Sequence, residues 1–166
     1  AFNQRTIAEI LDMICMLGAL VGAGERAEQL AANLSAGVAD VRAASAALPR
    51  RPKVFFEEWD DPLISGIAWV SELVEAAGGI DLFPELSRGR AAKDRIVTPD
   101  EVVRRAPDII VGSWCGKKFR PEKVAARPGF ADVAAVKTGS VHEIKSSLIL
   151  QPGPAALTDG LAALHA

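Results

Sequence analysis

The change of pattern at residue 53 constrains the fold more than any other feature of this sequence. Helical patterns lie upstream of it, whereas short apolar runs alternate with amphipathic segments downstream. The expected strands are 54–59, 107–113, 133–136 and 141–144, and the expected helices are 62–77, 98–106, 121–126 and 154–166. Strands that alternate with helices predict an α/β fold, in which helices flank a mainly parallel sheet.

Residues 5–47 are expected to be helical, in two pieces. Thr6 is suited to cap the first piece, because Glu9 three residues later completes a capping box. The glycines between residues 18 and 24 are expected to loosen and end this helix. The second piece, at 25–48, is rich in alanine and spans about 35 Å at about 1.5 Å per residue. It is either a surface helix packed on the sheet or a rigid strut that joins this domain to another.

Composition and charge exclude several classes of protein. A net charge of −2 and a pI of about 5.7 argue against nucleic acid as the main partner, since nucleic-acid-binding domains usually carry a basic excess. No uninterrupted apolar run is long enough to span a bilayer. The two histidines and the two cysteines, Cys15 and Cys115, form no metal-binding motif, whereas zinc needs about four convergent ligands. We therefore expect no protein-held metal and no cofactor, and a disulfide stays open.

The carboxyl edge of the predicted sheet gathers aromatic and charged side chains, and open parallel sheets bind ligands at this edge. The segments that meet there are 57–59, 113–117 and 145–147, with the basic loop 88–95 beside them. Trp59 and Trp114 lie in these loops together with Lys117. Exposed aromatic rings beside cations suit a large, flat, partly anionic ligand. The alternative is that each tryptophan closes the core.

An enzyme is the alternative to a binding protein. Cys115 is a candidate nucleophile, but it needs a base within hydrogen-bond reach, and the only candidate, His142, is expected at the opposite edge of the sheet. Glu57 and Glu58 are neighbours in a strand, so their carboxylates point to opposite faces and do not converge. We therefore predict a protein without enzymatic activity and keep a small cysteine-dependent enzyme as the alternative.

Three stretches of the chain carry a resemblance to a known family. They are KVFFEEWDDPLISGIAWVSELVEAAGGIDLF, RIVTPDEVVRRAPDIIVGSWCG and HEIKSSLILQPGPAALTDGL. Together they resemble the C-terminal lobe of class III periplasmic binding proteins, the substrate-binding components of ABC importers for vitamin B12, ferric siderophores and haem. The branch labelled cobalamin-binding is the most similar one. The resemblance implies a three-layer Rossmann-like lobe at 53–166, after a helical segment at 1–48 that includes the long helix between two lobes. It also implies that the N-terminal lobe and the signal peptide are missing here.

The resemblance also implies a function, which is the capture of a metal chelate in the periplasm, or outside the cell at the membrane, and its delivery to an ABC permease. Trp59 or Glu58 would contact a corrin, whereas Arg95 and Lys117 suit a ferric siderophore, so both cobalamin and siderophores stay candidates. The predicted ligand-binding residues are Glu58, Trp59, Arg95, Trp114, Cys115, Lys117 and Ser146, and the predicted permease-docking residues are Asp100 and Glu101. An interaction module, homodimeric through a face left exposed in this chain, is the alternative function.

Overall fold

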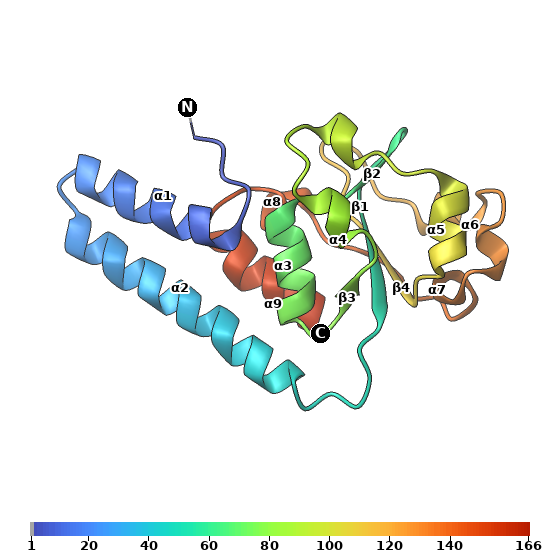
Figure 1. Ribbon diagram of the computed structural model, residues 1–166, viewed down its shortest axis with the longest axis horizontal. Helices are drawn as coiled ribbons and strands as arrows, with labels where there is room; N and C mark the ends of the chain where they lie inside the picture. Colours follow the sequence, from blue (N-terminus) through green and yellow to red (C-terminus); the bar gives the residue numbers. More distant parts are fainter. Residues whose placement is uncertain (1) are drawn as a thin grey trace.

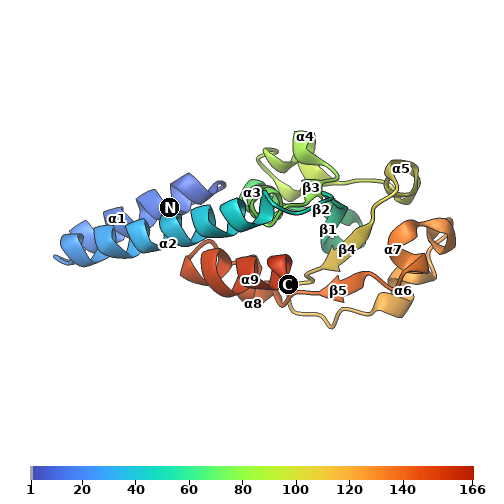
Figure 2. The same cartoon turned by 90° about the horizontal axis from the view of Figure 1, so that it is seen from below.

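Two antiparallel helices lead into the sheet. In the computed structural model, which describes residues 2–166, α1 spans Ile7–Leu20 and α2 spans Gly24–Ser45 (Figure 1). Thr6 caps α1 as the sequence predicts, because its hydroxyl accepts a hydrogen bond from the Glu9 N–H at 3.2 Å. The Glu9 carboxylate in turn accepts one from the Thr6 N–H at 3.3 Å. The closed end of this helical hairpin projects away from the sheet (Figures 1 and 2).

Gly18 does not loosen or end α1, contrary to expectation. It is buried inside the helix, where a Cβ atom would lie 2.1 Å from the Cβ of Ala27 on α2. The missing side chain therefore lets the two helices approach closely. The turn itself depends on Gly22, whose φ of 72° lies in the left-handed region that favours glycine.

The sheet is built around β1, which spans Lys53–Asp60. β4 (Ile109–Gly112) pairs with β1 in parallel, and β5 (Val141–Glu143) pairs with β4 in parallel. On its other side, β1 pairs first with β3 (Ile80–Asp81), in parallel, and then with β2 (Leu63–Ser65), antiparallel. The sheet is thus mainly parallel, which confirms the predicted α/β class. The carboxyl ends of β1, β4 and β5 meet at one edge.

Helices cover both faces of the sheet (Figures 1 and 2). Besides α1 and α2 they are α3 (Ala68–Ala76), α4 (Pro84–Ser87), the 3₁₀ helix η1 (Ala92–Arg95), α5 (Pro99–Arg105), α6 (Pro121–Ala125), the 3₁₀ helix η2 (Phe130–Asp132), α7 (Ala134–Lys137), α8 (Ser146–Ile149), the π-helix η3 (Ala156–Gly160) and α9 (Leu161–His165). Figure 2 places α2, α3 and α9 on one side of the sheet and α5, α6 and α7 on the other. An apolar core lies on each face of the sheet. Successive side chains of β1 point to opposite faces, so Phe56 packs in the core on the side of α2, α3 and α9, and Phe55 packs in the core on the side of α5, α6 and α7.

Residues 62–67 do not belong to a helix, although the sequence predicts one from residue 62. The chain turns at the cis peptide bond between Asp61 and Pro62 and pairs back onto the end of β1 as β2. Leu63 and Ser65 are buried on this strand, so the helix α3 begins only at Ala68. The apolar spacing of so short a stretch fits a strand and a helix alike.

Residues 133–136 also differ from the prediction, which was a short strand. Val133 and Ala135 are buried while Ala134 is exposed, and this alternation imitates the period of a strand. The Lys137 N–H donates to the Val133 carbonyl at 3.1 Å, which closes a helical turn instead. The remaining predicted strands and helices are present with small shifts at their ends. None of the helices within 2–166 combines the length and the apolar character that a membrane crossing requires.

Candidate functional site

A buried carboxylate organises the carboxyl edge of the sheet. Glu57, near the end of β1, is fully buried, and its carboxylate accepts two hydrogen bonds from the Arg127 guanidinium at 2.6 and 2.8 Å. The indole N–H of Trp114 donates to the same carboxylate at 2.9 Å. These three residues, here called the Glu57 cluster, tie the end of β1 to the loop after β4 and to the segment after α6. Sequence reasoning missed Arg127, because nothing local marks its pairing with a residue 70 positions away.

Trp114 is part of this framework and not of the exposed edge. Only 4% of it is exposed, and its ring meets Phe119 edge-on with the centroids 4.8 Å apart. Phe119 lies so close to β4 that a Cβ atom on Gly112 would be 1.8 Å from its ring. The structure therefore places Trp114 in the core, with its N–H bonded to a buried acid, and a contact between Trp114 and a ligand stays a prediction.

Arg95 and Glu58 form a second internal pair. The Arg95 guanidinium, 3% exposed, binds both carboxylate oxygens of Glu58, one of them at 2.9 Å, and also donates to the carbonyl of Ser65. The Ser65 hydroxyl donates to the carbonyl of Arg95 at 3.1 Å, so the loop before α5 is fastened to β2. Arg95 is thus buried and paired with an acid, and its contact with an anionic chelate stays a prediction.

Trp59 and Lys117 form the exposed part of the carboxyl edge. The ammonium of Lys117 lies 4.8 Å from the Trp59 ring centroid and 5.2 Å from that of Trp114, within the range of cation–π attraction. It also forms an ion pair with Asp60. Trp59 is half-buried, and its indole N–H donates to the carbonyl of Asp61 at 2.9 Å. The structure therefore joins two predicted residues, from β1 and from the loop after β4, in one solvent-facing unit.

The other two predicted ligand residues lie in the neighbouring loops. Cys115 is exposed, with a free thiol. Ser146 is half-buried and opens α8, just beyond the carboxyl end of β5. His142 is exposed on β5, and the described residues show no hydrogen bond between its ring and Cys115. No group of three or more histidine, cysteine, aspartate or glutamate side chains within 2–166 is arranged to hold a metal ion.

The two acids predicted to dock on a permease have different surroundings. Glu101 binds Arg104 through two hydrogen bonds of 2.7 and 2.6 Å and Arg105 through one of 2.7 Å, and these bonds lower its pKa to about 2. Arg105 also pairs with Glu85, so the acids and arginines of α4 and α5 form one Glu101 cluster. Asp100, by contrast, is exposed and has no hydrogen bond or ion pair from its side chain to the described part of the chain.

A helix-flanked parallel sheet, with a half-buried aromatic ring beside an exposed cation at its carboxyl edge, is typical of a lobe that binds a solute. The chain belongs to the periplasmic binding protein family, whose family model matches residues 1–148. This family consists of solute-binding proteins and not of enzymes, which confirms the prediction that the chain has no enzymatic activity. No curated protein sequence is similar enough to count as a relative.

The family match confirms the resemblance stated from the sequence, and several solved structures share the fold. A possible iron-binding (periplasmic solute-binding) protein from Staphylococcus epidermidis superposes with a TM-score of 0.82 at 21% identity, covering 98% of this chain and 62% of that one. An ABC transporter substrate-binding protein from Listeria monocytogenes superposes with a TM-score of 0.82 at 19% identity, covering 99% of this chain and 65% of that one. The periplasmic vitamin B12 binding protein BtuF of Vibrio cholerae superposes with a TM-score of 0.70 at 21% identity, covering 99% of this chain and 62% of that one. This chain therefore spans less than two thirds of the length of these three chains.

Proposed function

We propose that this chain is the C-terminal ligand-binding part of a periplasmic or surface-anchored solute-binding protein that captures a metal chelate, cobalamin or a ferric siderophore, for an ABC importer. The observation that carries the proposal is the contact between the half-buried Trp59 ring and the exposed Lys117 ammonium at the carboxyl edge of a solute-binding fold. Similar folds include proteins described as iron-binding and as vitamin B12 binding, which supports a metal chelate.

The chemistry of the pair suits such a ligand. The Trp59 ring supplies a flat apolar surface, and Lys117 supplies a cation whose charge is partly balanced by Asp60. An anionic group of the chelate competes with Asp60 for the ammonium, while the body of the chelate packs on the ring. Residues 53–166 form this wall of the binding cleft, and the helical segment 1–48 joins it to a second wall.

A titration of tryptophan fluorescence with cyanocobalamin, haemin and a panel of ferric siderophores tests the proposal. We expect quenching by one class of chelate, and about tenfold weaker binding in Lys117→Gln, because the variant loses the charge and the cation–π contact. Lys118→Gln is the matched control, since Lys118 is the exposed neighbour and forms no ion pair within 2–166. Equal affinity of the two variants for every chelate would remove the Lys117 contact from the proposal.

We further propose that Asp100 makes the permease contact, and that Glu101 keeps its helix in place. Asp100 is a free carboxylate at the protein surface, whereas Glu101 already satisfies two arginines. In a binding assay with the permease in nanodiscs, Asp100→Asn is expected to weaken docking and leave the melting temperature unchanged. Normal docking by this variant would exclude Asp100.

A second candidate function, self-association, is favoured by the exposed apolar side chains at the closed end of the α1–α2 hairpin. Leu20 and Val21 are 73% and 76% exposed, and Met16, Leu17 and Leu30 of the same hairpin are also exposed. Exposed apolar clusters mark interaction surfaces. Light scattering over a range of concentrations is expected to show a dimer that Leu20→Ser with Val21→Ser dissociates. A monomer at all concentrations would leave ligand capture as the only function proposed.

A further inference from the structure

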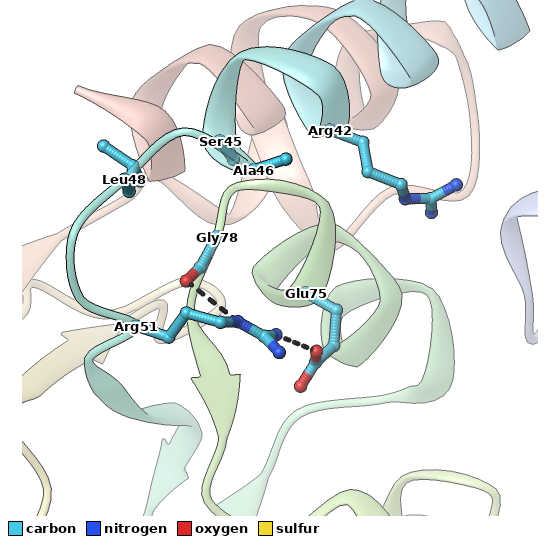
Figure 3. A pocket seen from close by; sticks show the side chains of 7 residues that line it. All are labelled: Arg42, Ser45, Ala46, Leu48, Arg51, Glu75 and Gly78. Carbon is cyan, nitrogen blue, oxygen red and sulfur yellow. Dashed lines mark hydrogen bonds and ion pairs between the residues drawn. The ribbon is translucent and has the colours of Figure 1, made fainter.

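A groove runs between α2 and α3, away from the carboxyl edge. It consists of two adjoining hollows of about 370 and 230 Å³, which share Arg42 of α2 and Glu75 of α3. Arg51 lines the first hollow, shown in Figure 3, and Arg88 lines the second. None of the predicted ligand-binding or docking residues lines either hollow. This α2–α3 groove is therefore a feature that the proposed function does not use.

The carboxylates of the groove are already occupied. Arg51 forms an ion pair with Glu75 (Figure 3) and also donates a hydrogen bond to the carbonyl of Gly79 at 2.6 Å. The second oxygen of Glu75 accepts a hydrogen bond from the Asp81 N–H at 3.2 Å. Glu72 accepts the N–H of Ile7 at 2.7 Å. These bonds hold the acids in the wall of the groove and leave them with little to offer a cation.

Two arginines of the groove are not occupied. The side chains of Arg42 and Arg88 are exposed, and neither has a hydrogen bond or an ion pair with any residue from 2 to 166. They come from different elements, α2 and the segment after α4, and yet line the same hollow. In Figure 3 the guanidinium of Arg42 points away from the pair of Arg51 and Glu75.

The hydroxyls beside them are also committed. The Ser71 hydroxyl donates to Asp81 at 2.6 Å, and the Ser87 hydroxyl donates to the Pro84 carbonyl at 2.9 Å. Among the side chains that line the second hollow, the donors without a partner within 2–166 are therefore the guanidinium groups of Arg42 and Arg88. A guanidinium presents its N–H groups as a planar fork, which matches carboxylate and phosphate oxygens.

From these contacts we propose that the α2–α3 groove binds a small molecule with phosphate or carboxylate oxygens, held between Arg42 and Arg88. Three arginines face two carboxylates in this groove, so an anion relieves the excess positive charge. The ion pair of Arg51 and Glu75 lines the first hollow, and Glu75 also lines the second. The volume of the hollows suits a molecule of the size of pyrophosphate or citrate.

Isothermal titration of the chain with pyrophosphate and, separately, with citrate at low ionic strength tests this site. We expect saturable binding of at least one of them, about tenfold weaker in Arg42→Gln and in Arg88→Gln, and weaker still as salt is added. Arg26→Gln is the matched control, because Arg26 lies on the same helix, is exposed, and does not line the groove. The tighter binding of pyrophosphate or of citrate shows whether the site prefers a phosphate or a carboxylate ligand.

The absence of saturable binding would overturn the proposal, as would equal losses in Arg26→Gln and the two groove variants. Thermal melts of all variants exclude loss of folding as the cause. Lys117→Gln is expected to bind both anions normally, since Lys117 lies at the carboxyl edge. A failure of the groove site is thereby distinguishable from a failure of chelate binding.

Discussion

Two clusters of acids and arginines in this chain use the same chemistry in opposite settings. In the Glu57 cluster the acid side chain is fully buried and the side chain of its partner Arg127 is 14% exposed. In the Glu101 cluster the acid is 31% exposed and Arg104 is 69% exposed. A buried charge that loses its partner is costly, whereas an exposed one is solvated by water. The comparison therefore separates a cluster that holds the fold from one that mainly sets the charge of a surface.

The largest effect is expected from Glu57→Gln. The change leaves the largely buried Arg127 guanidinium without its counter-charge, and we expect a loss of about 3–5 kcal/mol in the free energy of unfolding. Urea unfolding followed by circular dichroism measures it. The double variant Glu57→Gln with Arg127→Met is expected to recover part of the loss. A single variant as stable as the unchanged protein would contradict the role of the cluster.

An intermediate effect is expected from Trp114→Phe. This change removes the indole N–H that donates to Glu57 but keeps an aromatic ring against Phe119, and we expect a loss of about 1–2 kcal/mol. The affinity for chelates is expected to stay the same, because Trp114 is buried. A strong loss of chelate binding at unchanged stability would return Trp114 to the ligand site.

The smallest loss of stability at neutral pH is expected from Glu101→Gln. This loss becomes smaller still as the pH falls below the ordinary pKa of 4.5. Hydrogen bonds from Arg104 and Arg105 lower the pKa of Glu101 from its ordinary 4.5 to about 2, so the folded state favours the ionised form. The resulting stability is present above the ordinary pKa and is lost as the pH falls toward about 2. Between these two pH values, the free energy of unfolding should therefore fall less steeply with decreasing pH in the variant than in the unchanged protein. A slope equal to that of the unchanged protein would contradict the expectation.

Asp81 provides an opposing contribution in the same titration. Burial raises the pKa of Asp81, although Ser71 and the Phe83 N–H lower it in part. The folded state thus favours the protonated form, and this contribution to stability is lost as the pH rises through the raised pKa. Asp81→Asn is expected to flatten the pH dependence on the alkaline side of the acid range. Comparison with Glu101→Gln separates the two contributions to the pH dependence of stability. Identical pH profiles for the two variants would refute the opposing role of Asp81.

Much of the fold was predictable because it depends on local patterns. Thr6 with Glu9 marks the start of α1, and Thr98 marks the start of α5, where its side chain accepts the Glu101 N–H. The errors occurred where a short apolar run is ambiguous, as at β2 and α7. For the candidate site, the sequence predicted the location but not the contacts of each side chain. The location was predictable because the topology of parallel strands brings their carboxyl ends together.

The sequence by itself determined the α/β class, the long leading helices, the family resemblance and the edge of the sheet where a ligand is expected, since these follow from periodicity and motifs. Only the tertiary structure decided which side chains are free to act there. Trp114 and Arg95 are consumed by partners in the interior, whereas Trp59, Lys117 and Asp100 stay at the surface. Pairing over long distances in the chain leaves no local signal, because it depends on which groups burial forces to find a partner.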